Sequence, residues 1–259
     1  MREGRSVASL SASYRELEGR HVVITGGASG IGLCMVESFL GQAAHVTVID
    51  HDEHALRSCA ERFGDGRATF RCADLSSIAV ASTTIRDCAA VAPIDVLIAN
   101  AANDTRHSWN GVTEESWRNV LAVNLDHQFF CAQAAAGDMV GRGRPGVIIL
   151  MGSVAARRGR PAMIGYLTAK AAIDGMVRGL ARELGQKRIR VAGLVPGAIE
   201  TERQRRLWRT PASEQYLLTE QAMPVLLDGW DIAAMTLFLA SDGARGCTGQ
   251  IYVVDAGLS

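Results

Sequence analysis

A doubly wound α/β domain, with a seven-stranded parallel sheet flanked by helices, is the fold that this sequence predicts. Short apolar runs rich in β-branched residues alternate with longer stretches of helical periodicity, and a glycine-rich turn joins the first run to the first helix. The chain of 259 residues, 48% of them hydrophobic, is long enough to bury the core of one such domain. We expect this domain over residues 20–259, after a flexible N-terminal extension over residues 1–19.

The strands are predicted from near-continuous apolar runs, which are typical of parallel strands buried on both faces. These runs lie at 21–25, 45–50, 94–100, 146–153, 189–197 and 250–257, and a further strand is expected just before the "CADLS" stretch. Helical periodicity lies between them, at 30–42, 52–64, 76–91, 117–130, 164–186 and 231–242. The repeated strand–helix–strand unit predicts a Rossmann-type sheet.

Residues 198–228 break this alternation. They follow the carboxyl end of the sixth expected strand, and open α/β sheets bind their ligands at that edge. We therefore expect this segment to form a short substrate lid.

Charge balance, cysteine spacing and the length of apolar runs indicate which partners and which cellular compartment to expect. Lys plus Arg and Asp plus Glu both number 27, so no overall field attracts nucleic acid or an anionic membrane. The six cysteines include no C-x-x-C pair, and no apolar run approaches the ~20 residues of a membrane-spanning helix. A soluble, cytoplasmic protein with a small-molecule partner, no nucleic acid and no membrane is expected.

A metal site is considered and set aside. In "DHDEH", His51 and His54 have a ligand-like spacing, but a charged helix start explains the stretch better because no further Cys or His cluster completes a shell. No metal is expected.

The turn "TGGASGIG" over residues 25–32 predicts a phosphate cradle. Gly26, Gly30 and Gly32 allow close approach of a pyrophosphate to the backbone, and the start of the helix offers free N–H groups. Asp50 ends the second strand, where a carboxylate can bind ribose hydroxyls and would repel a 2′-phosphate, so NAD is favoured over NADP. Asp74 is expected either to contact adenine or to cap the next helix.

Four polar residues form a candidate proton-handling set. Tyr166 and Lys170 lie one helical turn apart, so an ammonium sits beside a phenol. Ser153 ends a strand at the same edge of the sheet, and Asn124 lies in a largely apolar helix. A cation beside the phenol would lower its pKa from about 10. Lys170 and the nicotinamide's positive charge are expected to do this.

These motifs, with "NA" in "IANAAN" and "PG" at 196–197, resemble the short-chain dehydrogenase/reductase family in order and spacing over residues ~20–259. The resemblance implies that Tyr166 is the acid/base, Ser153 orients the reacting oxygen, Lys170 holds ribose hydroxyls, and Asn124 supports a water relay. It further implies that cofactor contacts come from a set of loop residues. Besides the residues already named, these are Ser29, Ile31, Leu75, Asn100, Ala101, Pro196, Gly197, Ile199 and Thr201.

The sequence departs from the family pattern in two places. The usual "NNAG" reads Ala99-Asn100-Ala101-Ala102, which loosens the assignment of contacts near the adenosine. The serine that usually precedes Ser153 is Gly152, which is expected at most to widen the pocket.

Stretches such as "NAANDTRH" and "TERQRRLW" resemble the sugar dehydrogenase branch that includes D-xylose 1-dehydrogenases. A polyhydroxylated ring would suit the hydrogen-bond donors and the aromatic face of the lid, which come from Arg203, Gln204, Arg205 and Trp208. Some of these residues are expected to point to solvent. Asn103 is a further candidate contact. The family also implies a homotetramer, with helices around 114–139 and 164–186 pairing across two-fold axes.

The leading functional hypothesis is oxidation of the C1 hydroxyl of an aldose, a pentose or deoxyhexose, to the lactone with NAD. An NAD-dependent dehydrogenase of a secondary alcohol or keto-deoxy sugar acid is the alternative, and an acyl or steroid reductase fits the arginine-rich lid less well. A non-catalytic dinucleotide-binding protein is disfavoured by the complete Asn-Ser-Tyr-Lys set. A nucleic-acid binder using "RQRRLWR" is disfavoured by the balanced charge.

Overall fold

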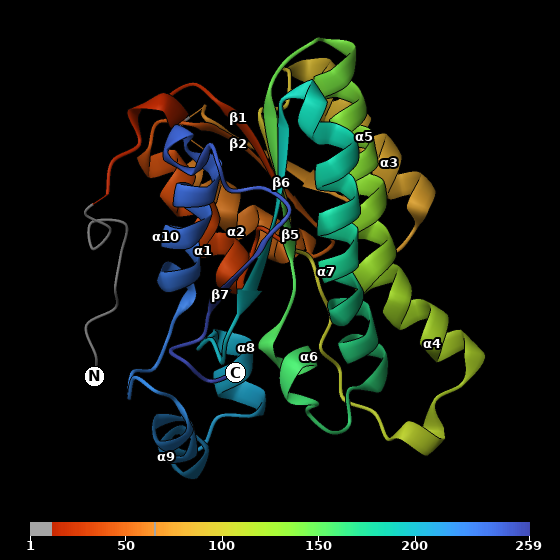
Figure 1. Cartoon of the computed structure of the whole chain (residues 1–259), viewed down its shortest axis with the longest axis vertical. Helices are drawn as coiled ribbons and strands as arrows, with labels where there is room; N and C mark the ends of the chain where they lie inside the picture. The colour runs from red at the N-terminus through yellow and green to blue at the C-terminus, as the bar shows by residue number, and fades with distance from the viewer. Residues whose placement is uncertain (1–11, 65) are drawn as a thin grey trace.

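Seven parallel strands form one sheet at the centre of the computed structural model, which describes residues 12–64 and 66–259 (Figure 1). The sheet has the order β3-β2-β1-β4-β5-β6-β7, so the direction of winding reverses between β1 and β4. The predicted doubly wound sheet is confirmed. The strands are β1 (His21–Thr25), β2 (His45–Asp50), β3 (Ala68–Cys72), β4 (Val96–Ala99), β5 (Gly146–Met151), β6 (Ile189–Pro196) and β7 (Ile251–Val254).

Helices cover both faces of the sheet (Figure 1). One layer consists of α1 (Gly30–Gly41), α2 (Glu53–Phe63) and α10 (Gly229–Ala240), and the other of α3 (Ile78–Val91), α5 (His127–Gly141) and α7 (Ile164–Leu184). Successive strand residues point to opposite layers: Val22 and Val48 join the first apolar cluster, whereas Val23 and Ile49 join the second. This two-sided burial explains why the strands read as continuous apolar runs.

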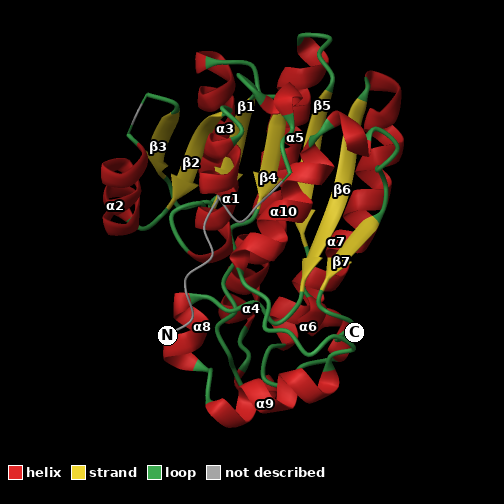
Figure 2. Ribbon diagram, turned by 90° about the vertical axis from the view of Figure 1, so that its left-hand side faces the viewer, coloured by secondary structure: helices red, strands yellow, loops and turns green. Residues whose placement is uncertain are grey.

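Shorter helices gather beyond the carboxyl ends of the strands (Figure 2). They are α4 (Glu114–Leu121), α6 (Val154–Arg158), α8 (Glu202–Leu207) and α9 (Pro211–Glu220). The last two form the segment expected as a lid, and each begins at a threonine, Thr201 or Thr210, whose side chain accepts a backbone N–H.

The helix expected over 117–130 is interrupted. A π-helical segment, Ala122–Asp126, separates α4 from α5. Such wide turns often mark functional sites, and this one contains Asn124.

The described end of the expected N-terminal extension packs on the domain. Leu17 is 2% exposed within the first apolar cluster, and the Tyr14 N–H donates to Gln42 Oε1 at 2.7 Å. Residues 1–11 lie outside the described part of the chain.

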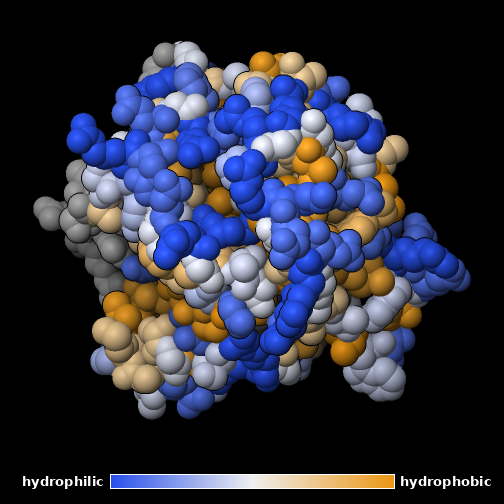
Figure 3. Space-filling model, turned by 45° about the horizontal axis from the view of Figure 1, so that its top comes forward, coloured by the Kyte–Doolittle hydropathy of each residue, from blue (hydrophilic) through white to orange (hydrophobic). Residues whose placement is uncertain are grey.

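The surface at the amino ends of the strands is mostly hydrophilic, with small apolar groups between the polar side chains (Figure 3). No helix within residues 12–64 and 66–259 combines the length and the hydropathy that a membrane span requires.

Candidate active site

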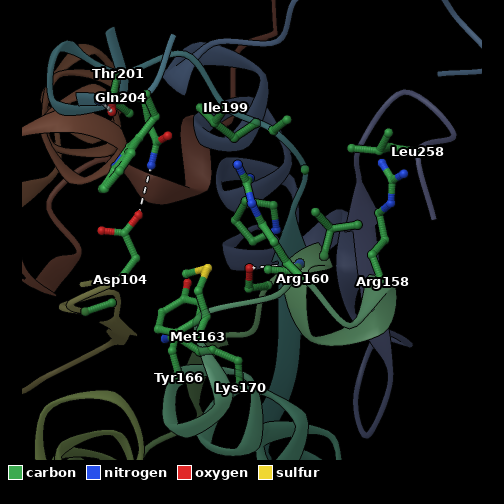
Figure 4. Close-up of a pocket in the computed structure, with 18 of the residues that line it drawn as sticks. Asp104, Arg158, Arg160, Met163, Tyr166, Lys170, Ile199, Thr201, Gln204 and Leu258 are labelled. Atoms are coloured by element: carbon green, nitrogen blue, oxygen red, sulfur yellow. Dashed lines mark hydrogen bonds between the residues drawn. The ribbon is translucent and has the colours of Figure 1, made fainter. Parts of the chain in front are cut away.

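A cavity of about 590 Å³ lies at the carboxyl edge of the sheet (Figure 4). Its wall combines the start of α1, the segments after β4, β5 and β6, the first turns of α7, and helices α8 and α9. Parallel strands bring these segments together because their carboxyl ends share one edge. Ser153, Tyr166 and Lys170 all line this cavity.

Tyr166 and Lys170 share one face of α7, as their spacing predicts. The Lys170 Nζ lies 5.7 Å from the centroid of the Tyr166 ring and donates to the Met151 carbonyl at 2.9 Å. Lys170 is only 4% exposed, and burial lowers its pKa to about 7. Its charge is therefore fractional at neutral pH.

The expected lowering of the Tyr166 pKa does not come from the protein groups alone. Burial raises the pKa of Tyr166 to about 12, a hydrogen bond with Ser153 opposes this, and the charge of Asp104 adds to it. A buried amine that has lost part of its charge cannot stabilise the phenolate strongly. The remaining contribution falls to the positive ring of the cofactor.

Ser153 begins α6, and its Oγ accepts the Ala155 N–H at 3.2 Å. The preceding Gly152 does not widen the pocket as expected. A Cβ at this position would lie 2.8 Å from Val195 Cγ2, so the space that a serine would occupy is already filled.

Asn124 is fully buried and is absent from the cavity wall. Its Oδ1 accepts the Asn103 N–H, and its Nδ2 donates to the carbonyls of Asn103 and Val120, all at 3.0 Å. The Asn124 carbonyl accepts from Gln128 Nε2 at 3.1 Å. The side chain therefore anchors the segment after β4, and the water relay implied by the family stays a prediction.

The glycine turn has the shape of a phosphate cradle. A Cβ on Gly32 would lie 2.0 Å from the Gly26 carbonyl oxygen, and Gly26 and Gly30 have φ of +62° and +54°. Ser29 begins α1 without a side-chain cap, which leaves the first N–H groups for a ligand. Asn100 Nδ2 donates to the Gly26 carbonyl at 3.0 Å and so ties the end of β4 to the turn.

Asp50 lies at the end of β2 and is 8% exposed. Its carboxylate accepts the N–H groups of Ala28 at 3.1 Å and His51 at 2.8 Å. Asp74 accepts the Ser76 N–H at 3.0 Å, which lowers its pKa. It does not cap the next helix, because Ser77 caps α3. The residues present fit a dinucleotide, because a glycine cradle and a strand-end carboxylate follow one another at the switch point.

The predicted cofactor residues divide into two groups. Ile31, Asn100, Pro196, Gly197, Ile199 and Thr201 line the cavity. The others lie outside its wall, along the same edge of the sheet: Gly26, Ser29, Gly30, Gly32, Asp50, Asp74, Leu75 and Ala101.

The segment expected as a lid turns some of its polar residues toward the cavity. Arg203, Gln204 and Trp208 line the cavity. Asp104 accepts from Arg203 Nε at 3.2 Å and from Gln204 Nε2 at 2.9 Å (Figure 4). Arg205 instead pairs with Glu200 at 3.3 Å and is 63% exposed.

Asn103 does not line the cavity, because its Oδ1 turns back to accept the N–H and Oγ1–H of Thr105. Sequence reasoning also missed several wall residues: Asp104, Arg106, Arg158, Arg160, Met163 and Arg209. Only the basic run "RRGR" just before Tyr166 carried a signal for part of this set.

A glycine turn that suits a dinucleotide lies at the same edge of the sheet as a cavity lined by Tyr166, Ser153 and the buried Lys170, and this combination defines a dehydrogenase or reductase of the α/β class. The family model described as Enoyl-(Acyl carrier protein) reductase matches residues 26–259. The chain belongs to this family, the short-chain dehydrogenases/reductases.

Two curated relatives cover nearly the whole chain. A D-xylose 1-dehydrogenase of Caulobacter vibrioides is 41% identical over 95% of this chain and 98% of its own length. A probable galactose dehydrogenase of Rhizobium meliloti is 39% identical over 96% of this chain and 98% of its own length. Among solved structures, 4-hydroxyisoleucine dehydrogenase complexed with NADH matches with a TM-score of 0.87 at 25% identity, covering 93% of this chain and 99% of that one.

Proposed function

We propose that this oxidoreductase oxidises the C1 hydroxyl of an aldose to the lactone, with NAD as the hydride acceptor. The observation that carries the proposal is the half-buried Tyr166 beside Ser153 at the wall of a cavity that also reaches the start of the glycine-turn helix at Ile31. The sugar dehydrogenases among the relatives support an aldose as the substrate class. The alternative within the family, oxidation of a secondary alcohol of a sugar acid, would use the same groups.

In this mechanism Tyr166 removes the proton from the C1 hydroxyl, and Ser153 holds the reacting oxygen by a hydrogen bond. Lys170 binds ribose hydroxyls, and Asn124 positions the segment after β4 through its bonds to Asn103. Bound NAD supplies the acceptor for the C1 hydride, and Asp50 would hold its adenosine ribose.

The test is Tyr166→Phe. This change removes the proton acceptor while keeping the ring, so kcat should fall by a factor on the order of 10² to 10⁴ with the NADH dissociation constant unchanged. Near-normal turnover of a folded variant with aldoses would refute the tyrosine mechanism.

The segment 198–228 is proposed to act as the lid of a single domain over residues 20–259. Two contacts support a closed arrangement: Asp104 with Gln204, and Arg158 with Glu220 at 3.2 Å. Hydrogen exchange in α8 and α9 should slow when NADH and sugar are bound. Unchanged exchange would count against the lid.

We further propose a cytoplasmic homotetramer that binds neither nucleic acid nor membrane. The exposed small residues Ala171, Ala172 and Gly175 on α7 would allow close helix pairing. The free cysteines suit a reducing compartment. Light scattering that reports a monomer at micromolar concentration would contradict the tetramer.

A further inference from the structure

The wall of the cavity carries an excess of positive charge. Five arginines line it, Arg106, Arg158, Arg160, Arg203 and Arg209, whereas Asp104 is the one acidic residue in that wall among the described residues. A neutral sugar offers hydroxyl groups that both donate and accept, and it does not require so many donors. The excess therefore calls for a ligand that is rich in acceptors.

Two of the five guanidinium groups have carboxylate partners within the protein. Arg203 pairs with Asp104 at 3.2 Å, and Arg158 pairs with Glu220 at 3.2 Å. For the other three, the described part of the chain provides no ion pair.

Contacts and charge effects connect the three remaining arginines to the same region of the cavity wall. The Arg106 guanidinium lies 3.6 Å above the centroid of the Trp208 ring, and Arg209 follows Trp208 directly in the chain. Burial and the nearby charge of Arg160 lower the pKa of Arg106, and the charge of Asp104 opposes this, so both charges act on that group. In Figure 4, Arg160 extends from the segment before Tyr166 into the side of the cavity opposite Asp104.

Two buried donors in this region have no acceptor in the described part of the chain. They are Arg209 Nη1 and Trp208 Nε1, whereas Arg209 Nη2 donates to the Ala198 carbonyl at 2.9 Å. Leaving a buried donor unpaired destabilises the folded state, and more strongly so for a charged group. A carboxylate, which only accepts, would satisfy these donors once the Trp208 and Arg209 side chains turn toward the cavity, since both atoms are closed off from solvent in the structure.

We infer that the cavity contains an anion subsite formed by Arg106, Arg160 and Arg209, and that the aldose oxidised at C1 carries a carboxylate, as a hexuronic acid does. The inference rests on the proposed function and narrows its substrate class. C1 must face Tyr166, so the proposal places the carboxylate at the end of the sugar away from C1, where the guanidinium groups of the subsite would bind it.

A matched pair of sugars tests the inference. Galacturonate and galactose differ only in the oxidation state of C6, and wild-type kcat/KM should favour galacturonate by about tenfold or more. Raising the ionic strength should increase KM for galacturonate and leave KM for galactose unchanged. Equal kcat/KM for the two sugars, or a preference for galactose, would overturn the anion subsite.

Arginine variants locate the subsite. Arg160→Gln and Arg106→Gln should each lower the ratio of kcat/KM for galacturonate to galactose by about tenfold. Arg157→Gln is the control, because Arg157 is exposed and outside the cavity wall, and it should leave the ratio unchanged. A proportional loss for both sugars in the Arg160 and Arg106 variants would overturn the assignment.

The pyrophosphate of the cofactor shares the acceptor chemistry of a carboxylate. A rise of about fivefold or more in the NADH dissociation constant of the Arg160 and Arg106 variants would assign these groups to the cofactor and overturn the inference. If neither sugar is oxidised, the proposed function fails separately. Thermal unfolding in the presence of NADH then still tests the subsite, because galacturonate and not galactose should raise Tm, and equal shifts would overturn it.

Discussion

Asn124→Ala should detach the segment after β4 from the helix layer. The substitution removes three hydrogen bonds of 3.0 Å, to the N–H and carbonyl of Asn103 and to the carbonyl of Val120. At about 1 kcal/mol each, with an added cost for the space left by a fully buried side chain, the free energy of unfolding should fall by about 2–4 kcal/mol. Urea unfolding followed by circular dichroism measures this change.

The same substitution should weaken substrate binding more than cofactor binding. Asn103 directly precedes Asp104, which holds Arg203 and Gln204 of the lid. Losing the anchor lets this carboxylate move, so KM for the sugar should rise several-fold while the NADH dissociation constant changes little.

Asn124→Asp provides an isosteric comparison with a distinct pH signature. An ionised carboxylate would face the carbonyls of Asn103 and Val120, so the folded state should raise its pKa above the unfolded value of about 4. The stability that protonation gives is complete below that unfolded pKa and is lost as pH rises through the folded pKa. The difference in free energy of unfolding between wild type and the Asn124→Asp variant should therefore increase from pH 5 to pH 8. An Ala variant within about 0.5 kcal/mol of wild type, or a gap that does not change with pH, would refute the anchoring role.

Three further predictions concern other parts of the site. Gly32→Ala should abolish NADH binding, measured by fluorescence titration, because the new Cβ would lie 2.0 Å from a backbone oxygen, whereas Gly141→Ala, with nothing within 4 Å, should bind normally. Asp50→Ser should lower kcat/KM with NAD and raise kcat/KM with NADP, and equal use of the two cofactors by wild type would contradict the role of Asp50. Burial lowers the pKa of His127 from 6.5 to about 3, so the free energy of unfolding of wild type should fall as pH falls from 6.5 toward 3, by about 5 kcal/mol in full. His127→Gln should flatten this dependence, and the exposed His54→Gln should not.

The parts of the molecule that sequence predicts well are those fixed by local chemistry. The strand at 21–25 and the turn at 25–32 are recognisable because a buried strand must be apolar and a tight turn against a phosphate must use glycine. Tyr166 and Lys170 share a helix face by spacing alone. The handedness of crossover connections adds a further constraint, because right-handed crossovers leave few possible orders of strands in a parallel sheet.

The lid shows where sequence reasoning ends. Nothing local distinguishes Arg203 from Arg205, yet one lines the cavity and the other pairs with Glu200 at its outer side. The difference comes from Asp104, which is 99 residues away in sequence from Arg203 and reaches it only through the fold. Asn124 is a similar case: sequence marks it as a polar group in an apolar helix, and only the π-helical turn shows that it binds the main chain of Asn103.

The Tyr166–Lys170 pair shows how burial changes a conclusion drawn from neighbouring charges. A lysine beside a tyrosine lowers the phenol pKa only while it is charged, and burial brings the pKa of Lys170 to about 7 and that of Tyr166 to about 12. At neutral pH the protein alone therefore keeps the proton on the phenol. A bound oxidised dinucleotide would supply a positive charge near this pair and would therefore favour the phenolate. The pH at which kcat reaches half its maximum should consequently report the assembled complex, and it should lie well below the pKa of Tyr166 in the protein by itself.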